Sequence, residues 1–385
     1  MSAASIGFPV VGVVGGGQLA RMMQAPAVAL GIRLRLLADS LSDSAAQVIH
    51  DVVVGDYRDL DTLRSFASGC DVITFDHEHV PTEHLRVLVD AGVVARPGPD
   101  ALVYAQDKGI MRDRLSQLGV PVPRWRHVHT AGDVDSFAHG VGGWPVIVKA
   151  TRGGYDGKGV WLVESVEVAA DVLSHDQVPG FLVEERVPFL RELSAMVARS
   201  PSGQAVAYPV VEMVQIDGIC REVYAPAPAI SDEHAVAAQQ TALRIAGELG
   251  VVGMLAVEMF DTDDGVLVNE LAMRPHNSGH WGIEGCVTSQ FENHLRAILD
   301  LPLGDPSATA PVAVMVNVLG GDLPDLYPAY LHCMAKDPGL RVHVYGKDVK
   351  QGRKVGHVTV VGDDLETLTE RARHAAAYMR GDIDE

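Results

Sequence analysis

The stretch from Trp144 to Val163 (WPVIVKATRGGYDGKGVWLV) constrains the fold more than any other part of the sequence. An apolar segment, Pro145–Val148, leads to Lys149, and a second one, Val160–Val163, follows a loop with four glycines in seven residues, GGYDGKG. Glycine at this density lets the backbone adopt positive φ and point successive N–H groups at an anion. The pattern predicts two strands joined by a loop that can close over a polyphosphate. An ordinary glycine-rich hairpin turn is the alternative that this stretch alone leaves open.

A second hairpin, about a hundred residues further on, carries acidic groups suited to a metal. Glu258 lies in an apolar strand expected at Val257–Phe260, and Asn269 and Glu270 end the return strand expected at Val266–Val268. Both carboxylates can lie on the same face or end of such a hairpin, because side chains of one strand face recur every second residue. Two carboxylates and a carboxamide suit Mg²⁺, which takes oxygen ligands and is completed by substrate phosphates. A solvated acidic hairpin is the alternative, but an unpaired carboxylate among apolar residues is costly.

Motifs spread over nearly the whole chain resemble a known superfamily. The ordered set of Lys149, GGYDGKG, EERV at 184–187, Glu192, Glu258 and Asn269–Glu270 resembles the ATP-grasp superfamily. Three further motifs resemble one family within it, the 5-(carboxyamino)imidazole ribonucleotide synthetases of purine biosynthesis. These motifs are GGGQLARM at 15–22, NELAMRPHNSGHW at 269–281 and YGKDVKQGRKVGHV at 345–358. Of these, RPHNSGH is far more specific than a glycine-rich loop.

The resemblance implies an α/β ATP-grasp fold of three domains, which suits a chain of 385 residues. We expect an N-terminal Rossmann-like parallel sheet over 1–98 and an ATP-grasp domain over 99–302 with a small lid at about 122–180. A small C-terminal α+β domain is expected over 303–385. The clearest single element is an amphipathic helix over Ser231–Leu249, capped by Ser231 and ended by Gly250.

Composition excludes several classes of partner. Lys and Arg number 31 against 50 for Asp and Glu, a formal charge of −19, which argues against a general nucleic-acid binder. No apolar run approaches the ~20 residues of a membrane span and the start has no signal-like core, so we expect a cytoplasmic protein without membrane contact. The four cysteines lie far apart without metal-ligand spacing, and we expect free thiols.

The N-terminal segment predicts a phosphate site. A buried strand, PVVGVV at 9–14, is followed by Gly15–Gly17, Gln18 and a helix from about Leu19, whose free N–H groups and dipole would attract an anion. An NAD-dependent dehydrogenase is the rival, with Asp39 placed for the ribose. However, the glycine pattern is GxxGGGQ rather than GxGxxG, and the later motifs would have no role. Pro26 predicts a kink or an early end of this helix.

The third strand after this helix, expected at Asp71–Phe75, leads into the segment FDHEHVP. Open α/β sheets bind ligands at this carboxyl end. The family usually has two glutamates flanking an apolar residue here, whereas this chain has Asp76, His77 and Glu78, so Glu78 is the better-supported contact. His77 and His79 suggest a metal, but two histidines on a loop are more often solvated or capping residues. A helix is expected over Gln106–Trp125, ended by Gly119 and Pro121.

The resemblance implies a set of residues for ATP. Lys108 stands where the family usually has arginine. Lysine keeps the positive charge but cannot form the two parallel hydrogen bonds of a guanidinium group. Main-chain groups near Glu184 and Val187 would read adenine, and Glu192 would bind ribose. The complete ATP set is Lys108, Lys149, Gly154, Tyr155, Asp156, Gly157, Lys158, Gly159, Glu184, Glu185, Arg186, Val187, Glu192, Gln215, Asn269 and Glu270. The metal set is Glu258 and Glu270, and the implied cofactors are ATP and Mg²⁺, with two ions expected.

A second implied set binds the ribonucleotide. It comprises Gln18, Leu19, Glu78, Tyr155, Arg274, His276, Asn277, Lys347, Lys350, Arg353 and Lys354. Met273, Lys350 and Gln351 depart from the proline, arginine and proline usual in the family. The cations at 347–354 could otherwise be a solvated turn.

The implied reaction begins when ATP phosphorylates bicarbonate to carboxyphosphate. This releases CO₂ in a dry site, where the amine of 5-aminoimidazole ribonucleotide attacks it while a closed lid excludes water. Asp156 would take the amine proton, and the catalytic set is Asp156, Lys158, Arg274 and Lys354. The family implies a homodimer. Alternatives are a formate-using ligase acting on glycinamide ribonucleotide and a nucleotide sensor without turnover.

Overall fold

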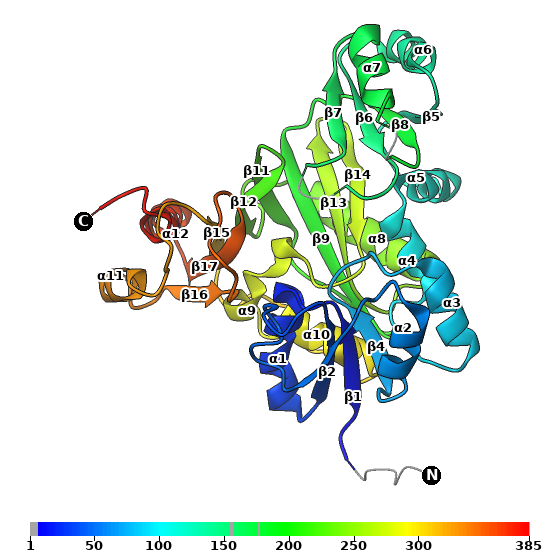
Figure 1. The fold of residues 1–385 in the computed structure, drawn as a ribbon. Helices are drawn as coiled ribbons and strands as arrows, with labels where there is room; N and C mark the ends of the chain where they lie inside the picture. The colour runs from blue at the N-terminus through cyan, green and yellow to red at the C-terminus, as the bar shows by residue number, and fades with distance from the viewer. Residues whose placement is uncertain (1–6, 155–156, 176–177, 385) are drawn as a thin grey trace.

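The computed structural model describes residues 7–154, 157–175 and 178–384 of the 385-residue chain. Within these ranges the chain has an α/β fold with three β-sheets. Figure 1 shows the N-terminal sheet at one end, the small third sheet at the opposite end and long strands between them, with the C-terminal helix to one side. The α/β class predicted from the sequence is confirmed.

The N-terminal sheet has four parallel strands in the spatial order β3-β2-β1-β4. They are β1 (Val10–Val14), β2 (Arg33–Ala38), β3 (Asp51–Val54) and β4 (Val72–Phe75). Helix α1 (Gln18–Leu30) covers one face and α2 (Leu60–Ala67) the other, and α3 (Thr82–Asp90) follows β4. A parallel sheet covered on both faces needs continuous apolar strands, which explains the run PVVGVV. The carboxyl ends of β1 and β4 lie side by side.

Helix α1 continues through Pro26, so the early end predicted from that proline is wrong. Proline removes a backbone hydrogen bond and costs about 3 kcal/mol inside a helix. Leu19, Met23 and Ala27 on the same helix are buried in the core, and this tertiary packing offsets the local cost. The helix ends at Gly31, whose φ of 70° is the left-handed conformation that glycine adopts without strain.

A nine-stranded sheet forms the centre of the molecule and continues into the C-terminal region. Its order is β14-β13-β9-β11-β12-β15-β17-β16, with β10 paired to β9. The strands are β9 (Arg191–Arg199), β10 (Ala205–Ala207), β11 (Val211–Ile216), β12 (Ile219–Ala225), β13 (Gly253–Thr262), β14 (Gly265–Ala272), β15 (Val312–Leu319), β16 (Arg341–Val344) and β17 (Lys354–Gly362). Antiparallel pairing of β12 with β15 joins the two parts. The C-terminal strands therefore extend the central sheet.

Helices cover this sheet and attach it to the N-terminal one. Helix α8 (Asp232–Glu248) packs on β9 and β13, and α10 (Gln290–Ile298) packs between β13 and α1. The short η1 (Asn277–Gly279) and α9 (Gly282–Gly285) precede α10, while α11 (Ala329–Lys336) and α12 (Leu365–Arg380) cover the C-terminal strands. The predicted cap is confirmed, because the Ser231 side chain accepts a hydrogen bond from the His234 N–H at 3.1 Å.

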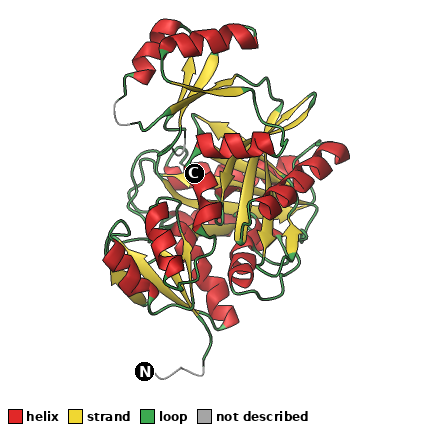
Figure 2. Cartoon of the chain, turned by 90° about the vertical axis from the view of Figure 1, so that its right-hand side faces the viewer, coloured by secondary structure: helices red, strands yellow, loops and turns green. Residues whose placement is uncertain are grey.

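The lid is a separate four-stranded antiparallel sheet in the order β5-β8-β6-β7. Its elements are β5 (Trp125–Val128), α6 (Ala131–Val141), β6 (Val146–Ala150), β7 (Val160–Val163), α7 (Val166–Leu173) and β8 (Phe181–Glu185). Figure 2 shows the lid standing apart from the body of the molecule. Because β8 belongs to this sheet, the lid extends to Glu185, past the limit near residue 180 expected from the sequence. The domain limits 1–98, 99–302 and 303–385 stay predictions.

Two helices, α4 (Pro99–Gln106) and α5 (Lys108–Gln117), lead from the N-terminal sheet to the lid. The helix expected to start at Gln106 instead starts at Lys108 as α5, whereas its predicted end at Gly119 is confirmed, because α5 ends at Gln117 and Gly119 has a φ of 65°. Asp107 separates α4 from α5: its backbone is extended, and its side chain caps α5 by accepting from the N–H groups of Gly109 and Ile110. No helix in the described ranges is long and apolar enough to cross a membrane. All four cysteines are free thiols, as predicted.

Candidate active site

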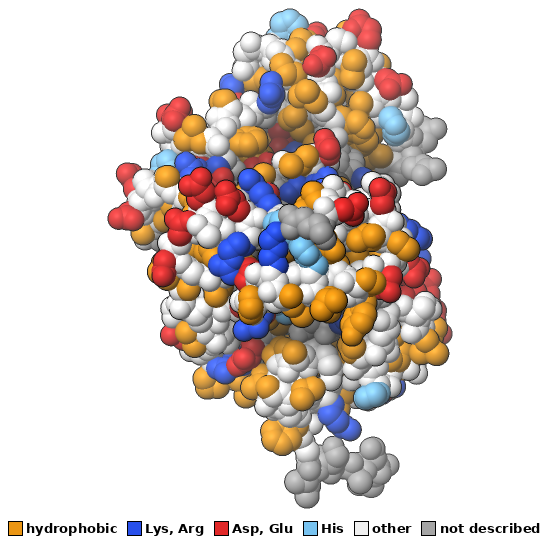
Figure 3. Space-filling view, turned by 90° about the vertical axis from the view of Figure 1, so that its left-hand side faces the viewer, with side chains coloured by type: hydrophobic (Ala, Val, Ile, Leu, Met, Phe, Trp, Pro, Cys, Tyr) orange, Lys and Arg blue, Asp and Glu red, His pale blue; other side chains and the backbone are white. Residues whose placement is uncertain are grey.

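One cleft of about 1330 Å³ lies between the lid, the central sheet and the carboxyl edge of the N-terminal sheet. Its wall includes the start of α1, the loop after β4, the start of α5, the glycine loop, the segment 184–189 and the β13–β14 hairpin. Figure 3 shows Lys and Arg side chains gathered along the groove between the lid and the body. A protein with a formal charge of −19 thus concentrates cations at this groove.

The lid side of the cleft is built on a buried ion cluster. Lys149 on β6, Glu184 on β8 and Arg112 on α5 are only 7%, 2% and 1% exposed. The Lys149 Nζ lies 2.7 Å from Glu184 Oε2, and Arg112 Nε donates to Glu184 Oε1 at 2.6 Å. Burial would raise the pKa of Glu184, but the charges of Lys149 and Arg112 outweigh it and bring the pKa down to about 2. Glu184 is therefore an ionised anchor for two cations.

The same cluster ties the lid to the acidic hairpin. Lys149 Nζ also donates to Asn269 Oδ1 at 2.9 Å. Arg112 donates to the carbonyls of Val268 and Asn269, at 3.0 and 2.8 Å. Arg112 was not among the predicted site residues, although its place one helical turn after Lys108, beside the buried Met111, was an available signal. An arginine on the buried face of a helix requires a charged or carbonyl partner.

The hairpin brings its two carboxylates together as predicted. Glu258 on β13 and Glu270 on β14 are register partners, and the ladder shifts immediately after them. Asn269 is the extra residue of this bulge, because Glu270 faces Glu258 while Val268 faces Met259. Neighbouring strand residues normally point to opposite faces, and the bulge lets both Asn269 and Glu270 line the cleft.

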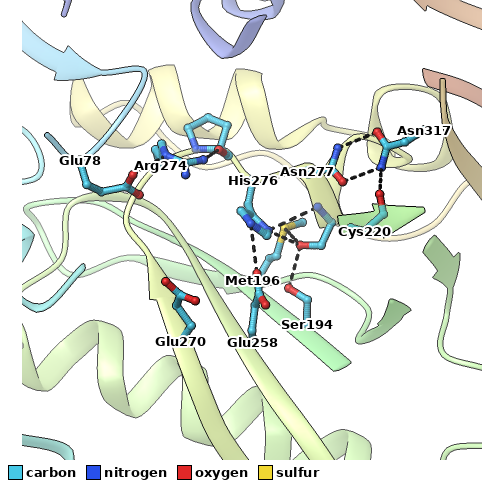
Figure 4. Close-up of polar contacts among 12 residues, drawn as sticks. Glu78, Ser194, Met196, Cys220, Glu258, Glu270, Arg274, His276, Asn277 and Asn317 are labelled. Carbon is cyan, nitrogen blue, oxygen red and sulfur yellow. Dashed lines mark hydrogen bonds and ion pairs between the residues drawn. The ribbon is translucent and has the colours of Figure 1, made fainter. Parts of the chain in front are cut away.

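The electrostatics of this pair suit a cation. Burial, followed by the charges of Glu270 and Glu192, raises the pKa of Glu258 to about 8. Glu270 accepts a hydrogen bond from Lys108 Nζ, and Glu258 Oε1 lies 3.2 Å from His276 Nε2. Figure 4 shows the two carboxylates side by side below the loop that carries His276. No group of three or more His, Cys, Asp or Glu side chains is placed to hold a metal among the described residues.

The loop after β14 is held by a buried glutamine. Gln290 accepts from the His276 N–H and donates to the His276 carbonyl, both at 2.8 Å. The His276 Nδ1 accepts from the Ser278 N–H at 3.4 Å, so the neutral ring carries its proton on Nε2, toward Glu258. Burial, aided by Arg274 and Lys354, lowers the pKa of His276 to about 3. Arg274 Nε donates to Glu78 Oε2 at 2.9 Å, which joins this loop to the N-terminal sheet.

Some predicted contacts are already engaged within the protein. The Asn277 carboxamide is paired reciprocally with Asn317, at 2.9 and 2.7 Å. Asp76 accepts from the N–H groups of Gly17 and Ala20, at 2.7 and 2.9 Å. The expectation that the N–H groups starting α1 are free for a phosphate is thus wrong for these two, because a neighbouring carboxylate caps the helix. This capping role of Asp76 was not predicted from the sequence.

Comparison with known proteins follows the same division of the chain. Residues 9–106 match the ribonucleotide synthetase preATP-grasp domain and residues 113–291 the ATP-grasp domain. Residues 313–371 match the phosphoribosylaminoimidazole carboxylase C-terminal domain. The N5-carboxyaminoimidazole ribonucleotide synthase of Mycobacterium tuberculosis is 55% identical over 377 residues, covering 96% of this chain and 88% of that protein. The chain belongs to this ATP-grasp family.

Solved structures of N5-carboxyaminoimidazole ribonucleotide synthases have folds similar to that of this chain. The enzyme of Thermus thermophilus gives a TM-score of 0.86 at 37% identity and covers 97% of this chain and 99% of that one. The Aspergillus clavatus enzyme, solved with ADP and 5-aminoimidazole ribonucleotide, gives 0.87 at 32% identity and covers 97% and 98%. As a member of this family the chain is an ATP-dependent ligase of purine biosynthesis, so the dehydrogenase alternative is wrong.

The cleft of this family member brings most of the predicted residues together. Those lining it are Gln18, Leu19, Glu78, Lys108, Lys149, Gly154, Gly157, Glu184, Glu185, Arg186, Val187, Glu192, Gln215, Glu258, Asn269, Glu270, Arg274, His276, Asn277 and Lys354. Lys347 contacts Gln18 at the cleft wall by donating to its Oε1. Lys350 and Arg353 are exposed on the turn before β17. Tyr155 and Asp156 lie outside the described residues.

The glycine loop lies against the opposite wall of the cleft. Gly157 has a φ of 75°, and a β-carbon there would lie 3.0 Å from Gly218 Cα in the turn between β11 and β12. Only glycine fits both the conformation and the approach. Lys158 and Gly159 follow in the same loop, with the Lys158 side chain exposed. The residue-by-residue ligand roles stay predictions.

Proposed function

We propose that this chain carboxylates 5-aminoimidazole ribonucleotide with bicarbonate and ATP, giving N5-carboxyaminoimidazole ribonucleotide, ADP and phosphate. The observation that carries the proposal is the hydrogen bond from Lys149 to Asn269. It joins the glycine-loop lid to the acidic hairpin across one cleft, as transfer of a phosphoryl group from ATP requires. Family membership supplies the identity of the acceptor.

The two ends of the cleft divide the substrates. ATP lies at the end formed by Lys149, the segment 184–187, Glu192 and Gln215. The ribonucleotide lies at the end where Arg274 and Glu78 meet the start of α1, with Gln18 and Lys347 at its phosphate. Lys354 stands between these ends, close enough to influence both Glu258 and His276. We assign Lys108, which is bonded to Glu270, to the transferred phosphate.

Mg²⁺ fits the donor set of the hairpin. Glu258 and Glu270 offer carboxylate oxygens. The raised pKa of Glu258 reflects burial first and then the charges of Glu270 and Glu192, and a divalent cation would offset both effects. Because two carboxylates do not complete a coordination shell, nucleotide phosphates and water would supply the remaining ligands. When bound, the metal neutralises phosphate charge during phosphoryl transfer.

The protein side chains act by placing and neutralising charged groups. A bicarbonate oxygen attacks the γ-phosphorus and ADP leaves, and Lys149 and Lys158 balance the charge on the phosphates. The resulting carboxyphosphate separates into CO₂ and phosphate. The exocyclic amine then forms a bond to the carbon of CO₂, and its proton passes to Asp156. The role of Asp156 is carried by the family resemblance.

The direct test is ADP release with purified enzyme. Release should require both 5-aminoimidazole ribonucleotide and bicarbonate, and the carboxylated product should appear in equal amount. Equal stimulation by formate with glycinamide ribonucleotide would instead favour a formate-using ligase, and ATP binding without turnover would favour a sensor. The variant Asp156→Asn should bind ATP normally but lose carboxylation, and retention of carboxylation would exclude Asp156 as the proton acceptor.

We also propose a cytoplasmic homodimer, on the family resemblance alone. Light scattering coupled to size-exclusion chromatography should give twice the chain mass of 41.1 kDa. A monomer at micromolar concentration would contradict the dimer. Cell fractionation tests the location.

A further inference from the structure

Two histidines on the loop after β4 have no part in the function proposed so far. His77 and His79 both line the cleft, on either side of Glu78. His77 is half-buried, while the His79 side chain is exposed at the cleft. They therefore present a pair of rings at the end of the cleft that we assign to the ribonucleotide.

This loop is fixed in shape by Gln106 at the end of α4. The Gln106 amide donates to the carbonyls of Glu78 and Val80, at 2.8 and 2.7 Å, and its oxygen accepts from Thr82 Oγ1 at 2.6 Å. The carbonyl oxygen and both N–H groups of this side chain are thus used. A ligand meeting the loop finds a preformed surface, which reduces the entropy lost on binding.

The rings form a stack. The His77 and His79 centroids lie 5.2 Å apart with an interplanar angle of 28°. His77 also contacts the Tyr57 ring at 4.6 Å, and the Arg58 guanidinium lies 5.0 Å from the Tyr57 centroid. The His79 N–H donates to His77 Nδ1 at 3.1 Å, which fixes the proton of a neutral His77 on Nε2. The Tyr57 and His77 rings are tilted by 53°, so the stacked pair is His77 and His79, and the row of ring contacts runs from buried Tyr57 to exposed His79.

A metal does not suit these histidines. Burial, together with the charges of His79, Arg274 and Arg58, lowers the pKa of His77 to about 4, because the surroundings disfavour added positive charge. The His77 Nδ1 atom is also occupied by the His79 N–H, and no group of three or more His, Cys, Asp or Glu side chains is placed to hold a metal among the described residues. A planar ligand ring is a better match, since aromatic faces stack with offset geometry at such distances.

The position of the His77–His79 pair in the cleft determines which ligand ring it can contact. Glu78, between the two histidines, is bonded to Arg274 on the loop after β14. Adenine is assigned to the segment 184–187 on the lid side of the cleft, so the nearer planar group is the aminoimidazole ring of the second substrate.

We propose that His79 stacks on the aminoimidazole ring of the ribonucleotide, and that His77 is a positioning residue that supports His79. This inference rests on the proposed function and names the residues that distinguish a ring-bearing ribonucleotide from an open-chain one such as glycinamide ribonucleotide. Stacking of one base on an aromatic side chain corresponds to about a tenfold change in affinity.

The main test compares His79→Ala with His79→Phe. The alanine variant should raise the KM for 5-aminoimidazole ribonucleotide about tenfold, with the KM for ATP and the melting temperature unchanged. Phenylalanine keeps a stacking face and should restore the KM. The matched control is His50→Ala, an exposed histidine near the N-terminal sheet that does not line the cleft, and it should change neither KM.

His77 is tested by the same pair of substitutions. His77→Ala should reproduce part of the rise in KM, and His77→Phe should rescue it because the ring, rather than the Nδ1 acceptor, supports His79. An unchanged KM in His79→Ala, a failure of phenylalanine to restore it, or an equal rise in the KM for ATP would each overturn the inference.

Calorimetric binding of the ribonucleotide separates this inference from the proposed function. If wild-type enzyme turns over and His79→Ala binds the ribonucleotide as tightly as wild type, the stacking inference fails and the function stands. If wild-type enzyme neither binds nor carboxylates the ribonucleotide, both fail, since the inference rests on that function.

Discussion

The two ends of the cleft are built on different principles. At the nucleotide end, Lys149, Glu184 and Arg112 form an ion cluster that is almost completely buried. At the ribonucleotide end, the side chains of Arg274 and Glu78 form a pair that is 23% and 13% exposed. A buried charge whose partner is removed is strongly destabilising, whereas a partly hydrated one is screened. Substitutions in the ion cluster at the nucleotide end should therefore reduce both ligand binding and stability. Substitutions at the ribonucleotide end should reduce ligand binding alone.

The largest effect is expected for Arg112→Met. It removes one of the two cations that balance Glu184, so the free energy of unfolding should fall by about 3–5 kcal/mol. Urea titration followed by circular dichroism measures this. The matched control is Arg124→Met, which breaks a pair with Glu185 in which Arg124 is 59% exposed, and it should cost less than about 1 kcal/mol. Equal losses would show that burial does not distinguish the two pairs.

The stabilising effect of the Lys149–Glu184–Arg112 cluster should also depend on pH. The pKa of Glu184 is about 2 in the folded chain against an ordinary value of 4.5, so the unfolded state binds more protons between these values. Its contribution is complete above pH 4.5 and is lost as the pH falls toward 2, by about 3 kcal/mol in total. Unfolding free energies of wild type and Glu184→Gln at pH 5 and pH 3 measure it. The wild type should lose more stability than the variant, and parallel losses would contradict the assignment.

A substitution in the β13–β14 hairpin should reduce activity without reducing stability. Glu258→Gln removes a carboxylate crowded by burial and by Glu270, so the melting temperature should stay level or rise. The kcat for ADP release should fall on the order of a hundredfold, since the charge that would hold Mg²⁺ is lost. Coupled ADP assays at several Mg²⁺ concentrations and a thermal melt provide both readings. Normal turnover would exclude Glu258 from the metal set.

The smallest effect should come from the ribonucleotide end. Arg274→Lys keeps the charge but loses the guanidinium Nε that bonds Glu78, and the KM for the ribonucleotide should rise about tenfold, the effect of losing ~1.4 kcal/mol of charge-assisted hydrogen bonding. Stability should not change. The control Arg86→Lys alters an exposed pair with Asp100 outside the cleft and should be neutral. A marked loss of stability in Arg274→Lys would remove the contrast between the two ends.

Much of this architecture could be predicted without coordinates. The strand Val160–Val163 has the limits expected from the sequence, and the strand expected at Asp71–Phe75 is found as Val72–Phe75. The family, the activity and the pairing of Glu258 with Glu270 are confirmed as well. These features are local patterns or long motifs, which a linear sequence records directly.

What the sequence determined by itself is the alternation of apolar and polar residues, the glycine loop and the motifs that identify the family. Only the tertiary structure decided that Asn269 forms a bulge, that Asp76 caps α1 and that Arg112 lies beneath Glu184. It also decided that the C-terminal strands extend the central sheet. Each of these depends on a partner distant in sequence, and the cost of leaving a buried polar group unpaired is settled only when that partner is in place.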